Sequence, residues 1–457
     1  MTQPTVDEAG ITELSGRFSG QLLRPGDDGY EEARTIHNGM IDKRPALIAR
    51  CLGVADVVDA VNLARSDDLE VAVRGGGHNV AGNAVCDGGV MIDLSLMKGI
   101  QVDPKGRTVR AQGGVTWGEF NRETQVHGLA TTGGIVSTTG IAGLTLGGGL
   151  GWLMGKYGMA VDNLLSAELV LANGDVVRAS EDENADLFWG LRGGGGNFGV
   201  VSSFEYQLHP VGPVVSGVIA HPIDSAKDVL RFYREFTASL PDELTVFSGL
   251  LHAPDGSGLP IAAMILCHCG PPAEAEAAVR PVKEFGFPLM DAIGPTGYSE
   301  TNTMLDAGHP KGALNYWKSN FLNELSDAAI ETLIDRFSTC PSPMSGLLLE
   351  HFHGAATRVG ETDTAFPHRR PGHNFLIVSE WQDPAASEEN IAWARETYAA
   401  MQPYMASGRY VNYLGEDEGE DPVASAYGSN YERLRSLKNK YDPTNLFHMN
   451  QNIRPAG

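Results

Sequence analysis

Residues 74–79 read Arg-Gly-Gly-Gly-His-Asn, a run that could both bind an anionic ligand and react with it. The apolar residues 71–73 before the run predict a buried strand that ends there. Glycine lacks a Cβ and tolerates positive φ, so the backbone N–H groups of the run can gather around a phosphate, and Arg74 would add positive charge. A phosphate loop alone has no need of the imidazole of His78. The run therefore predicts a cofactor that is held by its phosphates and tethered through a histidine.

Glycine makes up 56 of the 457 residues, and the excess is concentrated in two further segments. Eight of the 19 residues from 133 to 151 are glycine, as are five of the seven from 193 to 199. Leu, Trp, Phe and Val interrupt these segments, so we expect close approach of the backbone to a ligand rather than low-complexity sequence. Residues 194–199 fit the dinucleotide pattern G-x-G-x-x-G, but residues 200–206 after them are strand-like. Because that pattern needs a helix at this point, a Rossmann fold is rejected.

Residues 349–354, Leu-Glu-His-Phe-His-Gly, are polar where a core strand is normally apolar. On a strand, His351 and His353 would share one face and Glu350 would lie on the other. Two histidines could begin a metal site, but no third ligand lies nearby in the sequence, so lining a substrate cavity is the favoured interpretation. The run Cys-His-Cys at 267–269 is interpreted as a buried strand, because alternation would send its histidine away from the cysteines. No metal is expected.

The composition, 42% hydrophobic and 20% charged residues, is that of a soluble globular protein. A net charge of −23 argues against nucleic acid as a partner, because binding it needs a basic surface. The acidic run 416–421 is interpreted as a solvated loop. The amino terminus lacks a basic and apolar signal segment, and no apolar run reaches the ~18 residues of a membrane span. We therefore expect a cytoplasmic protein with no membrane contact, and five cysteines imply no disulfide framework.

Hydrophobic periodicity predicts the order of the secondary structure. Residues 1–45 resemble a helical lead-in, and the pair Asn173-Gly174 predicts a hairpin turn between two strands. Beyond about residue 213, strands alternate with helices, which indicates an antiparallel sheet covered by helices, and the tail from about 405 is expected to form loops. The expected strands are 45–50, 71–73, 90–94, 108–112, 167–172, 176–179 and 200–208, and the expected helices are 54–66, 117–127, 226–240, 273–285, 326–337 and 387–401.

Several segments resemble the FAD-linked oxidases of the berberine bridge enzyme-like group, within the vanillyl-alcohol oxidase superfamily and its PCMH-type FAD-binding domain. They are residues 74–82, 134–151, 186–201 and 442–453. The resemblance implies an α+β fold in three parts. A two-subdomain FAD-binding domain would span 1–212, an α+β substrate-binding domain with an antiparallel sheet would span 213–404, and a C-terminal segment, 405–457, would return to the FAD-binding domain.

The resemblance also implies the flavin contacts. His78 would be bonded to the 8α-methyl group of the flavin ring. Many relatives carry a second link from a cysteine, but this chain has Val136 there, which has no nucleophile, so FAD is expected to be covalently bound through His78 only. Thr139 would lie beside flavin C4a, where it influences oxygen access. The other expected cofactor-binding residues are Arg74, Gly75, Gly76, Gly77, Asn79, Gly82, Gly134, Ser137, Gly140, Gly143, Gly147, Gly199, Val201, Asn412, Asn450 and Asn452.

The proton acceptor is left open. In some relatives a tyrosine matching Tyr413 removes a substrate proton, although a phenol with a pKa of about 10 needs a lowered pKa or a hydride-coupled transfer to do so. If 410–413 is a strand, Tyr413 faces away from Asn412. The family's other base, a glutamate upstream of Trp381, falls at about Asn374, which cannot accept a proton. The expected catalytic residues are Tyr413, Glu350, His353 and Thr139.

The resemblance implies an FAD-dependent oxidase. Hydride would pass from a C–H bond of an alcohol, an amine or an activated carbon to flavin N5, and O2 would reoxidise the flavin to give H2O2. Relatives include 6-hydroxynicotine oxidase-like enzymes and tailoring enzymes of secondary metabolism, so the substrate is a small molecule of open identity. The alternatives are a flavin dehydrogenase that uses another electron acceptor and a non-catalytic flavin-binding protein. The protein is expected to be a monomer or homodimer.

Overall fold

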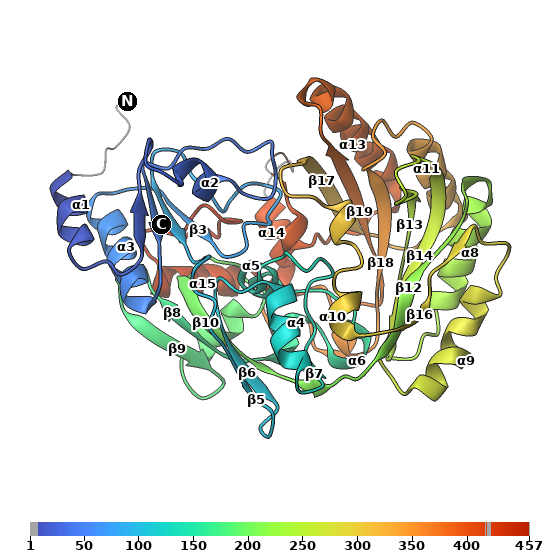
Figure 1. Cartoon of the computed structure of the whole chain (residues 1–457), viewed down its shortest axis with the longest axis horizontal. Coiled ribbons are helices and arrows are strands. Elements are labelled where there is room, and N and C mark those ends of the chain that lie inside the picture. Colours follow the sequence, from blue (N-terminus) through green and yellow to red (C-terminus); the bar gives the residue numbers. More distant parts are fainter. Residues whose placement is uncertain (1–7, 416, 418–421, 457) are drawn as a thin grey trace.

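A computed structural model describes residues 8–415, 417 and 422–456. The amino-terminal residues 1–7 and all of the acidic run except Asp417 lie outside this description. The chain forms two halves that lie side by side (Figure 1). One half holds the first 210 or so residues together with the C-terminal tail, and the other is built on a large sheet. The expected α+β fold with antiparallel sheets is confirmed.

The first sheet contains the strand that leads into the His78 loop. It has four strands in the order β1-β2-β4-β3, with β2, β4 and β3 parallel and β1 antiparallel at the edge. The helix α3 (Val54–Ser66) connects β2 to β3 and buries its apolar stripe against the sheet, as the periodicity predicted. The strands are β1 (Gln21–Leu23), β2 (Leu47–Arg50), β3 (Val71–Arg74) and β4 (Val90–Asp93).

The second sheet is antiparallel and has the order β5-β6-β10-β8-β9. Gly174 adopts a φ of 88° in the turn between β8 and β9, so the predicted Asn-Gly hairpin is confirmed. The central strand β10 directly follows the glycine-rich run 193–199, so this run is followed by a strand rather than by the helix that a Rossmann unit requires. The strands are β5 (Ile100–Asp103), β6 (Thr108–Gln112), β8 (Leu164–Val170), β9 (Val176–Ser180) and β10 (Val200–Gln207).

The third sheet has eight antiparallel strands, ordered β15-β12-β14-β13-β18-β19-β17, with β16 also paired to β12. Four helices cover its outer face and share a core with it, as predicted (Figure 1). The strands are β12 (Val214–Pro222), β13 (Leu244–His252), β14 (Pro260–His268), β15 (Met290–Asp291), β16 (Gly294–Thr296), β17 (Leu314–Phe321), β18 (Gly346–Phe352) and β19 (Gly372–Trp381). The helices are α8 (Ala226–Thr237), α9 (Pro272–Lys283), α11 (Asp327–Phe337) and α13 (Ser387–Met401).

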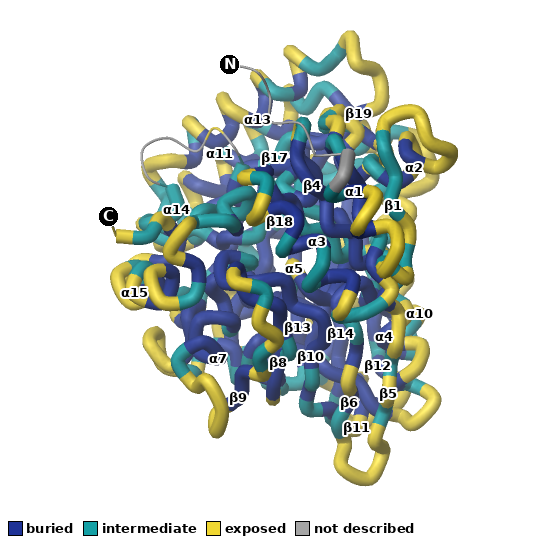
Figure 2. The backbone as a smooth tube through the Cα atoms, turned by 90° about the vertical axis from the view of Figure 1, so that its left-hand side faces the viewer, coloured by how far each residue is buried: buried dark blue, intermediate teal, exposed yellow. Residues whose placement is uncertain are grey.

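Shorter elements join the sheets, and the strands form the dark interior in Figure 2. The helices are α1 (Glu8–Ser15), α2 (Tyr30–Arg34), α4 (Trp117–Gln125), α5 (Ile141–Leu146), α6 (Met154–Tyr157), α7 (Ala185–Leu191), α10 (Tyr298–Thr301), α12 (Ala355–Arg358), α14 (Pro422–Tyr427) and α15 (Tyr431–Tyr441). The 3-10 helices include η1 (Ala160–Asn163), η2 (Ile223–Ser225), η3 (Asp306–Gly308), η4 (Pro384–Ala386), η5 (Gln402–Tyr404), η6 (Val411–Tyr413) and η7 (Gly428–Asn430). A two-stranded sheet pairs β7 (Leu129–Ala130) with β11 (His209–Pro210).

Three sequence predictions are wrong. From residue 8 on, the lead-in contains two short helices around β1, and the tail is not made of loops because it carries α14 and α15. Few apolar residues mark α15, and its buried Lys438 is paired with Asp442 over 2.7 Å, so a hydrophobic pattern could not show it. Residues 411–413 form the 3-10 helix η6 rather than a strand. This turn brings Asn412 and Tyr413 to the same cavity.

Among the described residues, no helix is long and apolar enough to cross a membrane. The five cysteines are unpaired. Cys267 and His268 lie in β14, so the predicted buried strand is confirmed there. No group of three or more His, Cys, Asp or Glu side chains within the described part of the chain could hold a metal ion.

Candidate functional site

A deep cavity separates the two halves of the molecule. Its empty volume is about 1720 Å³ with the open mouth included. The first half contributes the three glycine-rich segments, and the large sheet contributes side chains from β17, β18 and β19. The cavity therefore extends from the glycine-rich segments to the face of the large sheet.

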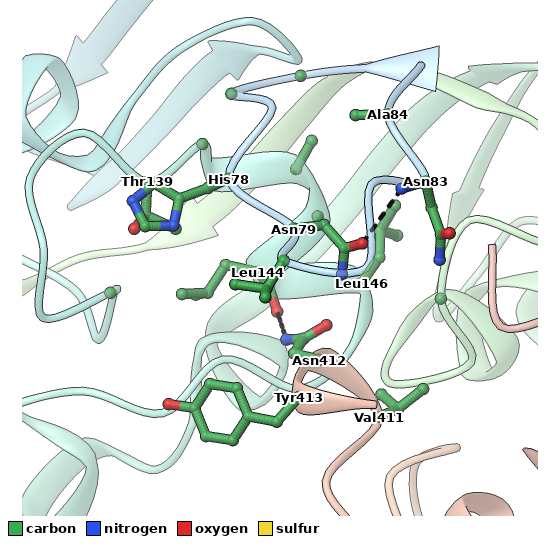
Figure 3. A pocket seen from close by; sticks show the side chains of 18 of the residues that line it. His78, Asn79, Asn83, Ala84, Thr139, Leu144, Leu146, Val411, Asn412 and Tyr413 are labelled. Atoms are coloured by element: carbon green, nitrogen blue, oxygen red, sulfur yellow. Dashed lines mark hydrogen bonds between the residues drawn. The ribbon is translucent and has the colours of Figure 1, made fainter. Parts of the chain in front are cut away.

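The His78 loop forms one wall of the cavity. Gly75, Gly76 and Gly77 line it after β3, and His78 and Thr139 are among the lining residues (Figure 3). The ring of His37 stacks on His78 with 3.9 Å between centroids. Burial, followed by the charges of His37 and His309, lowers the pKa of His78 to about 3. The imidazole is therefore neutral at pH 7 and keeps one nitrogen lone pair free for bonding.

The second glycine-rich segment meets the first directly. A Cβ on Gly76 would overlap the backbone of Gly140, so neither position tolerates a side chain. Val136, Thr139 and Gly143 line the cavity from this segment. It also contributes Gly134 and Gly140 to the lining.

The C-terminal tail closes the cofactor side. The amide Nδ2 of Asn412 donates to the carbonyl of Leu144 over 3.0 Å (Figure 3), and that of Asn450 donates to Gly196 over 2.8 Å. Gly199, Val201 and the first-loop Asn79 also line the cavity. Nε2 of His78 and the hydroxyl of Tyr427, both from lining residues, are buried with no hydrogen-bond partner in the structure. Glycine-lined walls and buried polar atoms without partners fit a bound dinucleotide such as FAD.

A buried carboxylate lies at the substrate side of the cavity. Tyr413 donates its hydroxyl to Oε1 of Glu350 over 2.9 Å, and Asn374 donates its amide to Oε2 over 2.7 Å. Burial raises the pKa of Glu350 to about 7, and these two hydrogen bonds act in the opposite direction. Burial and the neighbouring Glu350 raise the pKa of Tyr413 well above its usual range, so the phenol stays protonated at neutral pH.

Glu350 and Asn374 face each other across the β18–β19 ladder. The resemblance places a glutamate base at about Asn374, where this chain has an amide. In this fold the carboxylate instead stands on the neighbouring strand, and the amide holds it in place. The sequence left the proton acceptor open because this pairing depends on the register of two strands.

Seven expected site residues lie outside the cavity lining. They are Arg74, Gly82, Ser137, Gly147, Asn452, His353 and the candidate metal ligand His351, which lies near the end of β18. Arg74 donates to the carbonyl of Ala33 and lies 3.9 Å from Asp93, rather than lining the cavity. Gly82 packs against Ile41, and a Cβ on Gly147 would overlap the Asn412 side chain.

Of the remaining four residues, three are held by their own contacts. Ser137 donates its backbone N–H and its hydroxyl to Asp306, and Oδ1 of Asn452 is buried without a partner. The rings of His351 and His353 stack 5.0 Å apart, and His353 packs against Gly155. The alternation predicted for β18 therefore holds, but the expectation that His353 lines the substrate cavity is wrong.

Several lining residues were not among the expected site residues. His309 follows η3 and shares a hydrogen bond of 3.0 Å between its Nδ1 and Oε2 of Glu380. Trp317 of β17 contacts His309 and Tyr413 edge-on, at 6.1 and 5.9 Å between ring centroids. The others are Val73, Val80, Asn83, Ala84, Leu94, Ile135, Ala142, Leu144, Leu146, Leu150, Gly195, Leu305, Leu348, Leu376, Val378, Tyr410, Val411, Tyr427 and Gln451.

Comparisons with known proteins agree with this site. Profiles described as FAD binding domain and as berberine and berberine like match residues 45–180 and 409–454. The chain is 33% identical to (R)-6-hydroxynicotine oxidase of Paenarthrobacter nicotinovorans, over 96% of this chain and 98% of that protein. The crystal structure of 6-hydroxy-D-nicotine oxidase from Arthrobacter nicotinovorans is 31% identical and covers 96% of this chain and 98% of its own, with a TM-score of 0.88.

A chitooligosaccharide oxidase structure is also similar, at 26% identity and a TM-score of 0.86, covering 98% of this chain and all of its own. The fold, the cavity and these matches define an FAD-dependent oxidoreductase. The chain belongs to the FAD-linked oxidases of the berberine bridge enzyme-like family.

Proposed function

We propose that this protein is an oxidase in which Glu350 takes the proton of a substrate amine or hydroxyl while hydride leaves the adjacent C–H bond. The bound FAD supplies the hydride acceptor at N5, and O2 regenerates it with release of H2O2. The observation that carries the proposal is the buried Glu350 carboxylate in the cavity, held by Tyr413 and Asn374. A general base works best when its pKa lies near the working pH, and Glu350 has a pKa of about 7.

Tyr413 then acts as a hydrogen-bond donor rather than as the base. Its phenol keeps its proton because its pKa is raised well above the usual range. The hydroxyl orients the Glu350 carboxylate and stabilises its charged form. Asn374 does the same from the other side, so the free lone pairs of the carboxylate point to the substrate.

The walls around Glu350 favour a substrate with an apolar or aromatic body. Leu305, Leu348, Leu376, Val378 and Trp317 line this part of the cavity. The Trp317 indole N–H is bonded to Asn315 over 3.0 Å, so the ring offers the substrate only its apolar surface. An aromatic amine or a benzylic alcohol suits this surface better than a sugar, whose many hydroxyls would lack partners. A tailoring role in secondary metabolism would fit such a substrate.

We further propose a single covalent link between FAD and His78. The neutral, stacked imidazole has a free lone pair, and Val136 on the facing segment has no nucleophilic atom. Thr139 lines the same cavity as His78, where it would influence access of O2 to the flavin (Figure 3).

Two measurements test these proposals. The intact mass after acid denaturation, with peptide mapping, should show one FAD on the peptide that contains His78; release of all flavin would overturn the link.

Under nitrogen, a panel of aromatic amines and benzylic alcohols, 6-hydroxynicotine included, should bleach the yellow colour, and air should restore it. Bleaching without recovery would indicate a dehydrogenase. No bleaching by any member would indicate a flavin-binding protein without this activity.

A further inference from the structure

Three imidazoles gather where the proposed link would form. His37, from the loop after α2, stacks on His78 with an interplanar angle of 19°. His309 is close enough to both rings that, when protonated, it lowers their pKa values, after the larger effect of burial. The backbone holds the cluster together, because His37 donates its N–H to Gly77 and accepts one from Gly312, each over 2.9 Å.

A buried carboxylate orients His309. Oε2 of Glu380 lies 3.0 Å from Nδ1 of His309, and Glu380 is fully buried at the end of β19. Burial raises the pKa of Glu380, and the contact with His309 opposes that rise. A carboxylate on one ring nitrogen fixes the orientation of the imidazole, so the other nitrogen, Nε2, is the one that can exchange a proton with a neighbour. His309 is one of the residues that line the cavity.

The Glu380–His309 pair lies apart from the substrate base. Trp317 stands between His309 and Tyr413, edge-on to both, and Tyr413 holds Glu350. In the proposed reaction, Glu350 accepts the proton of the substrate. The Glu380–His309 pair is therefore not required for that step, and the reactive group near it is His78.

We propose that His309, held by Glu380, is the base that drives formation of the covalent bond between His78 and FAD. This inference rests on the proposed link. Nε2 of His309 takes a proton from the 8α-methyl carbon, and the electron pair of the broken C–H bond stays on the flavin ring. The unprotonated nitrogen of His78 bonds to that carbon, and its ring later releases its N–H proton to water. The flavin is then reduced by two electrons, and O2 reoxidises it to give H2O2.

His37 is a positioning residue in this scheme. Its stacked ring fixes the plane of His78, and its Nε2 is buried without a partner in the structure. Burial lowers its pKa to about 4, so it stays neutral and adds no charge beside the attacking ring.

The test measures the covalent fraction of FAD in the full chain after acid denaturation, for the native protein and for H309Q, H309A and E380Q. H309Q and H309A should bind FAD without a covalent bond, or form the bond about 10²- to 10⁴-fold more slowly, the usual contribution of a general base. E380Q should slow attachment less, because His309 remains. Free imidazole added to yellow H309A should restore the mass increase. The matched control is E350Q, which should keep the full covalent fraction while losing substrate oxidation.

The outcomes separate the two proposals. A native protein that releases its FAD would contradict both the covalent link and the role of His309 as its base. A native protein that is fully tethered, with H309Q, H309A and E380Q tethered at the same rate, would overturn the role of His309 alone. Colourless H309Q and E380Q proteins, with no rescue of H309A by imidazole, would assign the pair to cofactor binding and equally overturn the role.

Discussion

Two buried carboxylates on neighbouring strands of one sheet have different partners. Glu350 on β18 and Glu380 on β19 are both almost fully buried, and burial raises the pKa of each. Glu350 contacts a phenol and an amide, neither of which accepts its proton. The Glu350 carboxyl can therefore exchange a proton with a substrate near pH 7. Glu380 contacts an imidazole, which it orients. The neighbour, more than the depth of burial, decides whether a buried acid transfers protons or positions another base.

The largest effect should come from E350Q. Glutamine keeps the shape and can accept the Asn374 hydrogen bond, but it cannot take a proton. We expect flavin reduction by a substrate under nitrogen to slow about 10²- to 10⁴-fold, as for loss of a general base. Stopped-flow absorbance of the flavin measures it directly. The control is E243Q, a change outside the cavity at a carboxylate paired with Lys156, which should leave the rate unchanged. Equal rates of flavin reduction for native protein and E350Q would show that Glu350 is not the base.

A smaller effect is expected for Y413F. The Tyr413 hydrogen bond lowers the pKa of Glu350, so its removal should raise that pKa further above its usual value. A hydrogen bond to a charged group is worth about 1.5–3 kcal/mol, or roughly one to two pH units. The acid limb of kcat/KM, near pH 7 in the native protein, should therefore move to higher pH. Y157F, outside the cavity lining, is the matched control. A limb that moves to lower pH, or does not move, would contradict the Glu350–Tyr413 assignment.

The glycine-rich segments and the Asn-Gly hairpin could be predicted because a backbone that contacts a ligand or turns sharply restricts the residue type at each position. His78 was found in this way, whereas Thr139 and Asn450 were predicted from the resemblance to the oxidase family, and all three line the cavity. The substrate side was found only in part. The Glu350–Asn374 pair depends on strand register, and Glu380 lies 71 residues from His309, so no local pattern could join them.

The smallest effect concerns the opposite face of the same strands. Burial, then the charges of His373 and His353, lowers the pKa of His351 to about 2, and burial lowers that of His373 to about 4. His351 and His373 therefore stay neutral in the folded protein at pH 7, and they affect its stability rather than catalysis. The unfolded chain binds protons below about pH 6.5 and the folded chain does not, so the free energy of unfolding should fall as pH drops through that value.

Each such histidine contributes a loss of up to about 1.4 kcal/mol per pH unit between its two pKa values. H351F removes one of them while filling the buried space, so its urea midpoint should fall less between pH 7 and pH 5 than that of the native protein. The same change at exposed His127 should leave the slope as it is. Identical slopes for H351F and native protein would mean that His351 is already solvated or paired when folded. The cavity face and the helix-covered face of β18 would then no longer differ in the way their ionisable groups respond to acid.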